Sequence, residues 1–306
     1  MTDVKLGVLL WNQATYWPAY EAAARRIDEL GYDHLWAWDN LYAIFGDPYQ
    51  PIFEGWMSLA AWAKSTERIR LGLLVGANTF RNPGLTAKLA ATLDHISDGR
   101  AILGLGAAWM EPEHREHGIE FGRSPGQRLD WLEEAVDACR RLLDGETVTS
   151  PPDGRYELAE LRHAPTPLQG HLPIMIGGSG EKKTLRTVAR HADMWNGMGS
   201  VETMRRKIDV LRGHCEDVGR DPATIERSAQ ALLFLSDDES WLEAQRAKGI
   251  PRATMIGTPS ELVDVVGSYV EAGVDELIVP DFTLGPASRA KDTYDRFLTE
   301  VAAPFR

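Results

Sequence analysis

The chain has 306 residues, of which 43% are hydrophobic and 25% are charged, a balance typical of a globular enzyme. Its formal net charge of −12 argues against nucleic acid and anionic membranes as partners, and its 2 cysteines are too few for a disulfide scaffold. No apolar run reaches the ~18 residues of a membrane span, so we expect a cytoplasmic protein that acts on a small molecule.

Strand-like and helix-like segments alternate along the chain. Short apolar runs, typical of strands buried on both faces of a parallel sheet, lie at 4–11, 34–38, 69–75, 100–105, 172–176, 193–196, 226–235 and 276–279. Segments with helical spacing follow them at 18–30, 54–64, 83–96, 125–143, 182–191, 202–217, 259–272 and 288–302. These β/α repeats predict an α/β protein with a single (β/α)8 TIM barrel over 1–306, rather than an open doubly wound sheet.

Two longer segments interrupt the repeats. The first, at about 145–170, is rich in proline and glycine, with weak strand propensity at 155–158. The second, at about 236–258, follows the seventh predicted strand and contains a helical segment near 239–247. Long loops in compact folds are often lids or substrate walls, and simple surface excursions are the alternative.

Two glycine clusters follow predicted strands. Gly104 and Gly106 end the fourth strand, and Gly177, Gly178, Ser179 and Gly180 follow the fifth, shortly before a helix. Because ligands bind at the carboxyl ends of barrel strands, both clusters indicate a binding site. The second cluster exposes backbone N–H groups in front of a helix, which predicts a phosphate site with Lys182 nearby. A flexible strand-to-helix turn is the alternative.

The first cluster departs from the dinucleotide-binding fingerprint. Trp109 stands where a third glycine would be expected, and Pro112 interrupts the helix that should follow. We therefore expect Gly106 and Trp109 at the mouth of a barrel, where the indole could stack on a planar cofactor. A tight turn with an ordinary buried tryptophan fits this motif equally well.

Polar side chains near the strand ends supply catalytic candidates. Asn40, which follows Asp39 at the end of the second strand, is placed to meet a ligand, although an aspartate also often begins a turn. Glu113 and His114 are candidates for acid–base chemistry, and a simple helix start is the competing interpretation. His114 and His117 lack a third ligand at a suitable spacing, so no metal site is predicted.

A further glycine follows the third strand. Gly76 permits unusual backbone angles and the close approach of a flat ligand, with Asn78 two residues beyond it. We therefore place both residues among the candidate cofactor-binding positions.

The ordered set of these stretches resembles the luciferase-like monooxygenase superfamily, in particular its branch of coenzyme F420-dependent (deazaflavin) oxidoreductases. The resemblance covers nearly the whole chain, and its matching stretches are 29–33, 38–39, 66–72, 80–83, 87–88, 93–94, 98–100, 103–106, 113–114, 118–119, 128–129, 132–135, 176–180 and 192–196.

The resemblance implies a (β/α)8 barrel with a flavin or deazaflavin in its C-terminal mouth. It implies that Leu74 and Val75 form a bulge behind the ring, often with a non-prolyl cis peptide. It also implies that Gly177–Gly180 hold the phosphate, that Asp39 contacts the polar edge of the ring, and that Lys182 faces the phosphate end. The family commonly forms homodimers.

Two departures from the family pattern bear on the chemistry. Asn40 stands where many deazaflavin enzymes have a catalytic histidine, and an amide cannot take up a proton near neutral pH. Trp109 stands where the sugar-phosphate dehydrogenases of the family place an acid, which weakens the case for a sugar-phosphate substrate. Glu113 and His114 remain as proton donors.

Three functional hypotheses follow. The first is an F420-dependent oxidoreductase that transfers a hydride between C5 of the deazaflavin and a small organic substrate, either an electron-poor C=C, C=N or nitro acceptor or, in reverse, an alcohol. The second is an FMN-dependent two-component monooxygenase that uses O2 and a partner reductase. The third, supported only by Asn40, is a flavin-binding barrel without catalytic activity.

Overall fold

Eight parallel strands close into a barrel, which confirms the predicted fold. The computed structural model describes residues 3–284 and 287–306, and only the backbone of 287–289. The barrel strands are β1 (Lys5–Leu9), β2 (His34–Ala37), β3 (Arg70–Leu73), β5 (Ala101–Gly106), β6 (Ile174–Gly177), β7 (Met194–Met198), β8 (Glu226–Gln230) and β11 (Glu276–Pro280). Pairing of β3 with β5 and of β1 with β11 completes the ring, and the short β4 (Gly76–Ala77) extends the pairing along β5.

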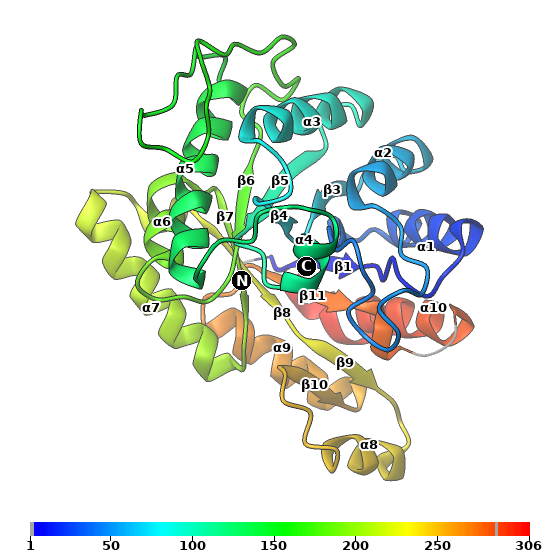
Figure 1. The fold of residues 1–306 in the computed structure, drawn as a ribbon. Helices are drawn as coiled ribbons and strands as arrows, with labels where there is room; N and C mark the ends of the chain where they lie inside the picture. Colours follow the sequence, from blue (N-terminus) through cyan, green and yellow to red (C-terminus); the bar gives the residue numbers. More distant parts are fainter. Residues whose placement is uncertain (1–2, 285–286) are drawn as a thin grey trace.

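Helices surround the strands, as expected for this fold (Figure 1). They are α1 (Trp17–Leu30), α2 (Gly55–Ser65), α3 (Pro83–Ile96), α4 (Glu111–Glu116), α5 (Pro125–Leu143), α6 (Thr184–His191), α7 (Val201–Val218), α8 (Glu239–Arg246), α9 (Pro259–Glu271) and α10 (Ala287–Arg296). Their starts follow local rules: Asn82 and Ser124 cap α3 and α5 ahead of a proline, and Thr258 forms a capping box with Glu261.

Two predicted helices differ in detail from the structure. The segment predicted at 288–302 is α10 followed by a π-helical stretch, Phe297–Ala302. The helix predicted from residue 182 begins at Thr184, because a turn at 181–183 separates it from the glycine cluster.

The seventh predicted strand, at 226–235, is two strands in the structure. β8 ends at Gln230, and β9 (Leu232–Leu235) leaves the barrel to pair in parallel with β10 (Thr254–Gly257). Helix α8 connects β9 with β10, so the second insertion contributes to a small β-α-β unit (Figure 1). The sequence missed β10 because its four residues are too few to show a clear period.

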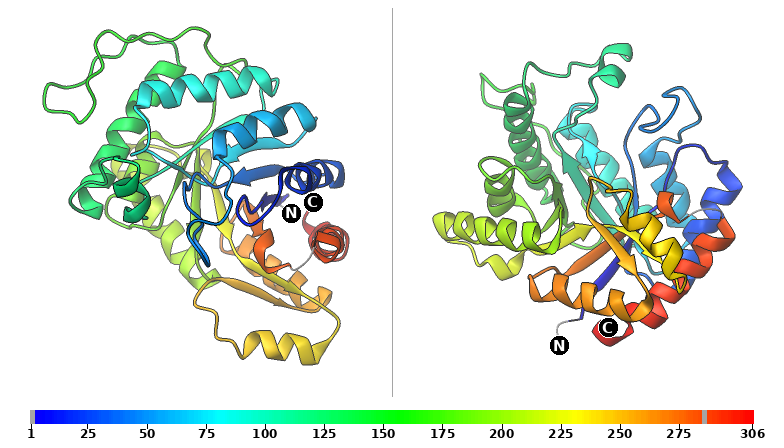
Figure 2. Two further views of the ribbon diagram at one scale, coloured as in Figure 1. Left: turned by 45° about the vertical axis from the view of Figure 1, so that its right-hand side comes forward. Right: turned by 90° about the horizontal axis from the view of Figure 1, so that it is seen from below.

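The first insertion has little regular structure. One isolated antiparallel bridge joins Val148 to Leu161, and the stretch 155–158 is not a strand. Figure 2 shows this loop projecting on the opposite side of the barrel from α8.

The barrel interior is filled with side chains. Trp36, Ile102, Met175 and Ile278 belong to a buried cluster inside the ring of strands, and a larger cluster lies between the strands and the helices. Gly72 makes room for Trp36, because a Cβ there would lie 2.6 Å from the indole ring. The barrel is therefore a packed core, and ligand space remains only at its ends.

Candidate active site

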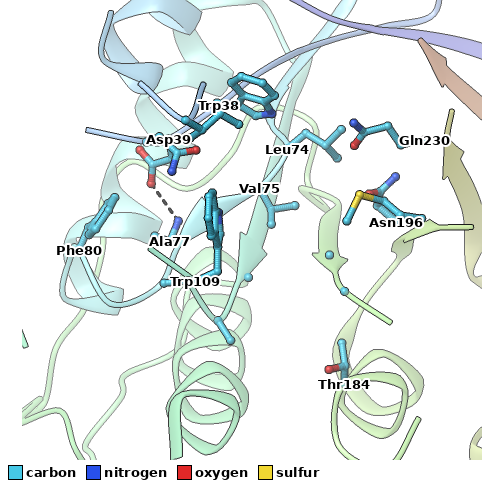
Figure 3. Close-up of a pocket in the computed structure, with 18 of the residues that line it drawn as sticks. Trp38, Asp39, Leu74, Val75, Ala77, Phe80, Trp109, Thr184, Asn196 and Gln230 are labelled. Carbon is cyan, nitrogen blue, oxygen red and sulfur yellow. Dashed lines mark hydrogen bonds between the residues drawn. The ribbon is translucent and has the colours of Figure 1, made fainter. Parts of the chain in front are cut away.

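A cavity of about 470 Å³ opens at the carboxyl ends of the barrel strands. Its walls come from the ends of β2, β5, β6, β7 and β8 and from the helices α4, α5 and α6 (Figure 3). The volume is within the ~300–1,000 Å³ typical of small-molecule and cofactor sites. The structure brings the following predicted site residues to this cavity: Asp39, Asn40, Leu74, Val75, Gly106, Trp109, Glu113, Gly177 and Gly178.

Val75 forms the central wall of the cavity. The Leu74–Val75 peptide bond is cis and non-prolyl, as the family resemblance led us to expect. The Val75 side chain lies against bare backbone: a Cβ on Gly106 would come within 2.6 Å of Val75 Cγ2, and one on Gly177 within 2.9 Å of both methyl groups. The two glycines therefore leave space for the Val75 side chain. A larger residue at position 106 or 177 would push Val75 into the cavity.

Gly76 and Asn78 lie behind this wall and do not line the cavity. Gly76 is not among the described residues with positive φ, so the unusual angles expected there are absent. Glycine is favoured there for another reason, since a Cβ would make a tight contact, 3.0 Å, with the Gly104 carbonyl oxygen. Asn78 is buried, and its backbone N–H donates to the carbonyl oxygen of Gly106 over 3.0 Å.

Asp39 lines the cavity with both carboxylate oxygens already paired. Arg81 donates to them through Nη1 and Nη2 over 2.7 and 2.9 Å, and the Ala77 N–H donates over 2.9 Å. Arg81 also binds Glu54 at 2.8 Å. Burial raises the pKa of Asp39, and the Arg81 guanidinium opposes this effect. The carboxylate thus anchors the strand end as well as facing the cavity.

Asn40 and Glu113 form a polar pair at the cavity edge. Asn40 Nδ2 donates to Glu113 Oε1 over 3.3 Å, and the Leu41 N–H donates to Glu113 Oε2 over 2.8 Å. Glu113 is 2% exposed, and its burial raises the pKa of the carboxyl group, although these hydrogen bonds lower it. A carboxyl group with a raised pKa beside a ligand cavity is suited to hold or deliver a proton.

His114 lies away from this pair. Its ring is buried between Phe80 and Phe121, with centroid distances of 4.7 and 4.8 Å. Nε2 meets Thr79 Oγ1 at 2.7 Å and Nδ1 meets the Met110 carbonyl oxygen at 2.8 Å, while burial lowers the pKa of the imidazole. Both ring nitrogens are occupied, so the geometry favours Glu113 over His114 as the proton donor.

The other end of the cavity is formed by Gly177, Gly178 and Thr184. Gly178 has a φ of 130°, a conformation that favours glycine. The Thr184 side chain is buried against the cavity, and its hydroxyl has no hydrogen-bond partner among the residues that the structure describes. An unpaired hydroxyl beside exposed backbone at the start of α6 is suited to bind a phosphate.

The other residues of the predicted phosphate site do not line the cavity. Ser179, Gly180 and Lys182 are not among the lining residues. Lys182 is exposed, while Lys183 is held by an ion pair with Asp130 at 2.6 Å. Lys182 is thus available to an anionic group that extends beyond the cavity.

Several residues that line the cavity were not predicted from the sequence. Asn196 points into the cavity from the middle of β7, and Gln230 from the end of β8 (Figure 3). Arg252, in the second insertion, also lines the cavity. Gln230 was missed because the predicted strand continues to residue 235, so Gln230 did not stand at a predicted strand end. The signal for Asn196 was its position at the end of a predicted strand, where barrel side chains meet ligands.

Aromatic side chains gather beyond the carboxyl ends of the strands. Trp11 packs on Phe45 and Phe282, with centroid distances of 5.3 and 4.7 Å. Trp109 is 63% exposed at the rim, so it is not the buried tryptophan of the alternative interpretation. It stands beside Val75 in Figure 3, where an indole can cover a bound ring.

Asp281, which follows β11, lies next to Trp11. Its carboxylate accepts a hydrogen bond from the backbone N–H of Trp11 over 2.8 Å, and burial raises the pKa of the carboxyl group to about 7. The native protein therefore binds this proton more tightly than the unfolded chain, so the stability that the proton confers is lost progressively as pH rises from the usual aspartate range to about 7.

We expect the unfolding free energy of the wild type, relative to that of Asp281→Asn, to fall by on the order of 1 kcal/mol between about pH 5.5 and about pH 8. Urea unfolding of both proteins across this range measures the difference. Parallel pH curves would contradict the raised pKa.

Comparison with known proteins places the chain in a family of oxidoreductases. Residues 7–252 match the family model described as luciferase-like monooxygenase, and the chain belongs to this family. An uncharacterized protein of Mycobacterium tuberculosis is 35% identical over 264 residues, or 84% of this chain and 78% of the relative. The phthiodiolone/phenolphthiodiolone dimycocerosates ketoreductase of the same species is 26% identical over 299 residues, or 90% of this chain and 75% of the relative.

Solved structures show the same fold. An F420-dependent secondary alcohol dehydrogenase in complex with an F420-acetone adduct superposes with a TM-score of 0.85 at 20% identity, covering 99% of both chains. The FMN-bound oxygenating constituent of 3,6-diketocamphane monooxygenase from Pseudomonas putida has a TM-score of 0.75 at 15% identity, covering 98% of both chains. No helix in the described part of this chain is long and apolar enough to cross a membrane.

Proposed function

We propose that the protein is an F420-dependent oxidoreductase that transfers a hydride to or from a small organic substrate in this cavity. The observation that carries the proposal is the arrangement of the walls. A flat apolar surface, Val75 over Gly106 and Gly177, leads to the unpaired Thr184 hydroxyl and the bare Gly178 backbone. This combination fits a planar ring with a phosphate-bearing side chain, which both F420 and FMN have.

Two features favour the deazaflavin. The exposed Lys182 lies beyond the phosphate end, where F420 carries its acidic tail and FMN has no further charge. A ketoreductase is among the relatives, and an F420-dependent alcohol dehydrogenase shares the fold. We therefore propose interconversion of a carbonyl or another electron-poor acceptor with its reduced form.

The residues of the chain would divide the remaining work. When bound, the deazaflavin supplies or accepts a hydride at C5. Val75 and Trp109 orient the ring, and Thr184 with Gly178 binds the phosphate. Glu113 holds the proton that the reduced substrate needs, while Asn40 fixes the Glu113 carboxyl group at the cavity edge.

Titration of the cofactor-free protein with F420, and separately with FMN, tests the proposal through quenching of tryptophan fluorescence. Trp109 and Trp38 line the cavity, so a bound ring should quench them. We expect tighter binding of F420, followed by turnover with hydride acceptors or alcohols under anaerobic conditions. Failure of both cofactors to bind would overturn the proposal.

A second candidate function is the FMN-dependent monooxygenase. The substitution that favours it is Asn40, since the histidine of many deazaflavin enzymes is missing. This function requires a partner reductase and O2, so preferential FMN binding with reductase-dependent oxygen consumption would identify it. For either function we propose a cytoplasmic homodimer. Light scattering of the purified protein tests the dimer.

Loss of the Thr184 hydroxyl should weaken cofactor binding. We expect Thr184→Val to raise the Kd of the cofactor about 10-fold or more, because a hydrogen bond to a charged group contributes ~1.5–3 kcal/mol. Thr187→Val is the matched control: Thr187 lies on the same helix and is equally buried, but its hydroxyl donates to the Lys183 carbonyl oxygen at 3.0 Å. Equal effects of the two variants on the Kd would show that the Thr184 hydroxyl does not bind the phosphate.

A further inference from the structure

A second group of potential ligands lies at the opposite end of the barrel. His34, Glu226 and Glu276 are the first residues of β2, β8 and β11, so they lie at the amino ends of the strands (Figure 1). One ligand atom from each lies within 4.8 Å of the others. The packed interior separates them from the catalytic cavity, so they serve no role in the proposed reaction.

Two carboxylate oxygens in this group have no partner. Glu276 is 0% exposed; its Oε1 accepts from Trp36 Nε1 at 3.3 Å and meets His34 Nδ1 at 2.8 Å, but its Oε2 is buried and unpaired. Glu226 Oε1 is also buried and unpaired, while Glu226 Oε2 pairs with Lys5. Buried carboxylate oxygens without a partner are costly, so such a pair is suited to share a cation.

The surrounding chain leaves room for these side chains. A Cβ on Gly7 would lie 2.3 Å from Glu276 Oε1, so glycine at this position gives the carboxylate its place. The Trp36 indole orients the same carboxylate from behind, as outer partners do at metal sites. A cleft lined by Glu226, Lys5 and Arg70 gives an ion a route from solvent.

We propose that His34, Glu226 and Glu276 bind a divalent metal ion of the zinc type at the amino ends of the barrel strands. One imidazole and two carboxylates form a ligand set that Zn²⁺ accepts, with water from the cleft in the fourth position. Ligand bonds of ~2.1 Å require closer ligand atoms than those present, so binding draws the three side chains together. The ion joins strands that lie far apart in sequence, and it therefore stabilises the end of the barrel at which the strands begin.

Zinc titration of the metal-free, untagged wild type is the first test. Isothermal titration calorimetry should give one Zn²⁺ per chain, and the melting temperature should rise with Zn²⁺ but not with Mg²⁺, which prefers oxygen ligands. Absence of saturable binding would overturn the proposal.

Variants locate the ion. Glu276→Gln should abolish binding, whereas Lys5→Gln should tighten it several-fold because it removes a competing positive charge; the Lys5 side chain is 44% exposed, so this variant should fold. His171→Gln is the matched control, since His171 and Asp193 form a 2.8 Å pair that no third potential ligand joins among the residues that the structure describes. Loss of binding in His171→Gln, or unchanged binding in Glu276→Gln, would refute the site. The Lys5 variant keeps the test valid if Glu276→Gln fails to fold.

Discussion

Glu113→Gln is expected to lower kcat by about 10²–10⁴-fold, because a positioned acid–base group contributes that much. The rate is measured with a substrate that the wild type turns over in the presence of its cofactor. The glutamine keeps the shape of the side chain and can still accept the Leu41 N–H, so the fold and the cofactor affinity should change little. Steady-state kinetics and fluorescence titration of the same preparation separate the two effects. A folded variant with full activity would exclude Glu113 as the proton donor.

The pH profile sharpens this test. Burial raises the pKa of Glu113, so in the direction of substrate reduction the wild-type rate should fall as pH rises through a value above the usual glutamate range. The variant should lack this fall. Glu116→Gln is the matched control: it lies on the same short helix α4, is far more exposed, and accepts a hydrogen bond from the Tyr49 hydroxyl at 3.2 Å. Equal losses in both variants would indicate a general effect on α4.

The barrel was predictable because its signals are local. Apolar runs, helix caps and the Pro-led helix starts at 83 and 125 each depend on neighbouring residues, and the structure places α3 and α5 at the predicted bounds. β8 and β9 were merged because Ala231 alone separates them in the sequence, and no turn residue marks the point where β9 leaves the barrel to pair with β10.

The site was predictable only in part, because side-chain partners are distant in sequence. The pairing of Asp39 with Arg81 spans 42 positions, and the sequence offered no reason to join them. His114 and Glu113 are adjacent, yet the turn of α4 sends the imidazole between two phenylalanine rings and the carboxylate to the cavity. The three proposed metal ligands show no telling spacing, since His34 and Glu276 are 242 positions apart.

Arg81→Ala should have the largest effect on stability. Asp39 is 3% exposed, and removal of its guanidinium partner would leave a buried carboxylate with only the Ala77 N–H. Breaking a buried ion pair on one side costs about 3–5 kcal/mol, so we expect a loss of that size in the unfolding free energy near neutral pH. Arg212→Ala is the control: Arg212 pairs with Asp209 at 2.9 Å with both side chains more than half exposed, and its loss should cost about 0–1 kcal/mol.

The origin of the loss can be tested by pH and by a second substitution. Burial already raises the pKa of Asp39 in the folded protein, and removal of Arg81 should raise it further. The native variant then binds the Asp39 proton more tightly than the unfolded chain, so its stability should recover as pH falls through the folded-state pKa. Asp39→Asn added to Arg81→Ala should also restore part of the stability, because an amide carries no charge to bury. If neither lower pH nor the second substitution reduces the loss, the lost stability comes from packing and from the contact of Arg81 with Glu54 rather than from the unpaired carboxylate.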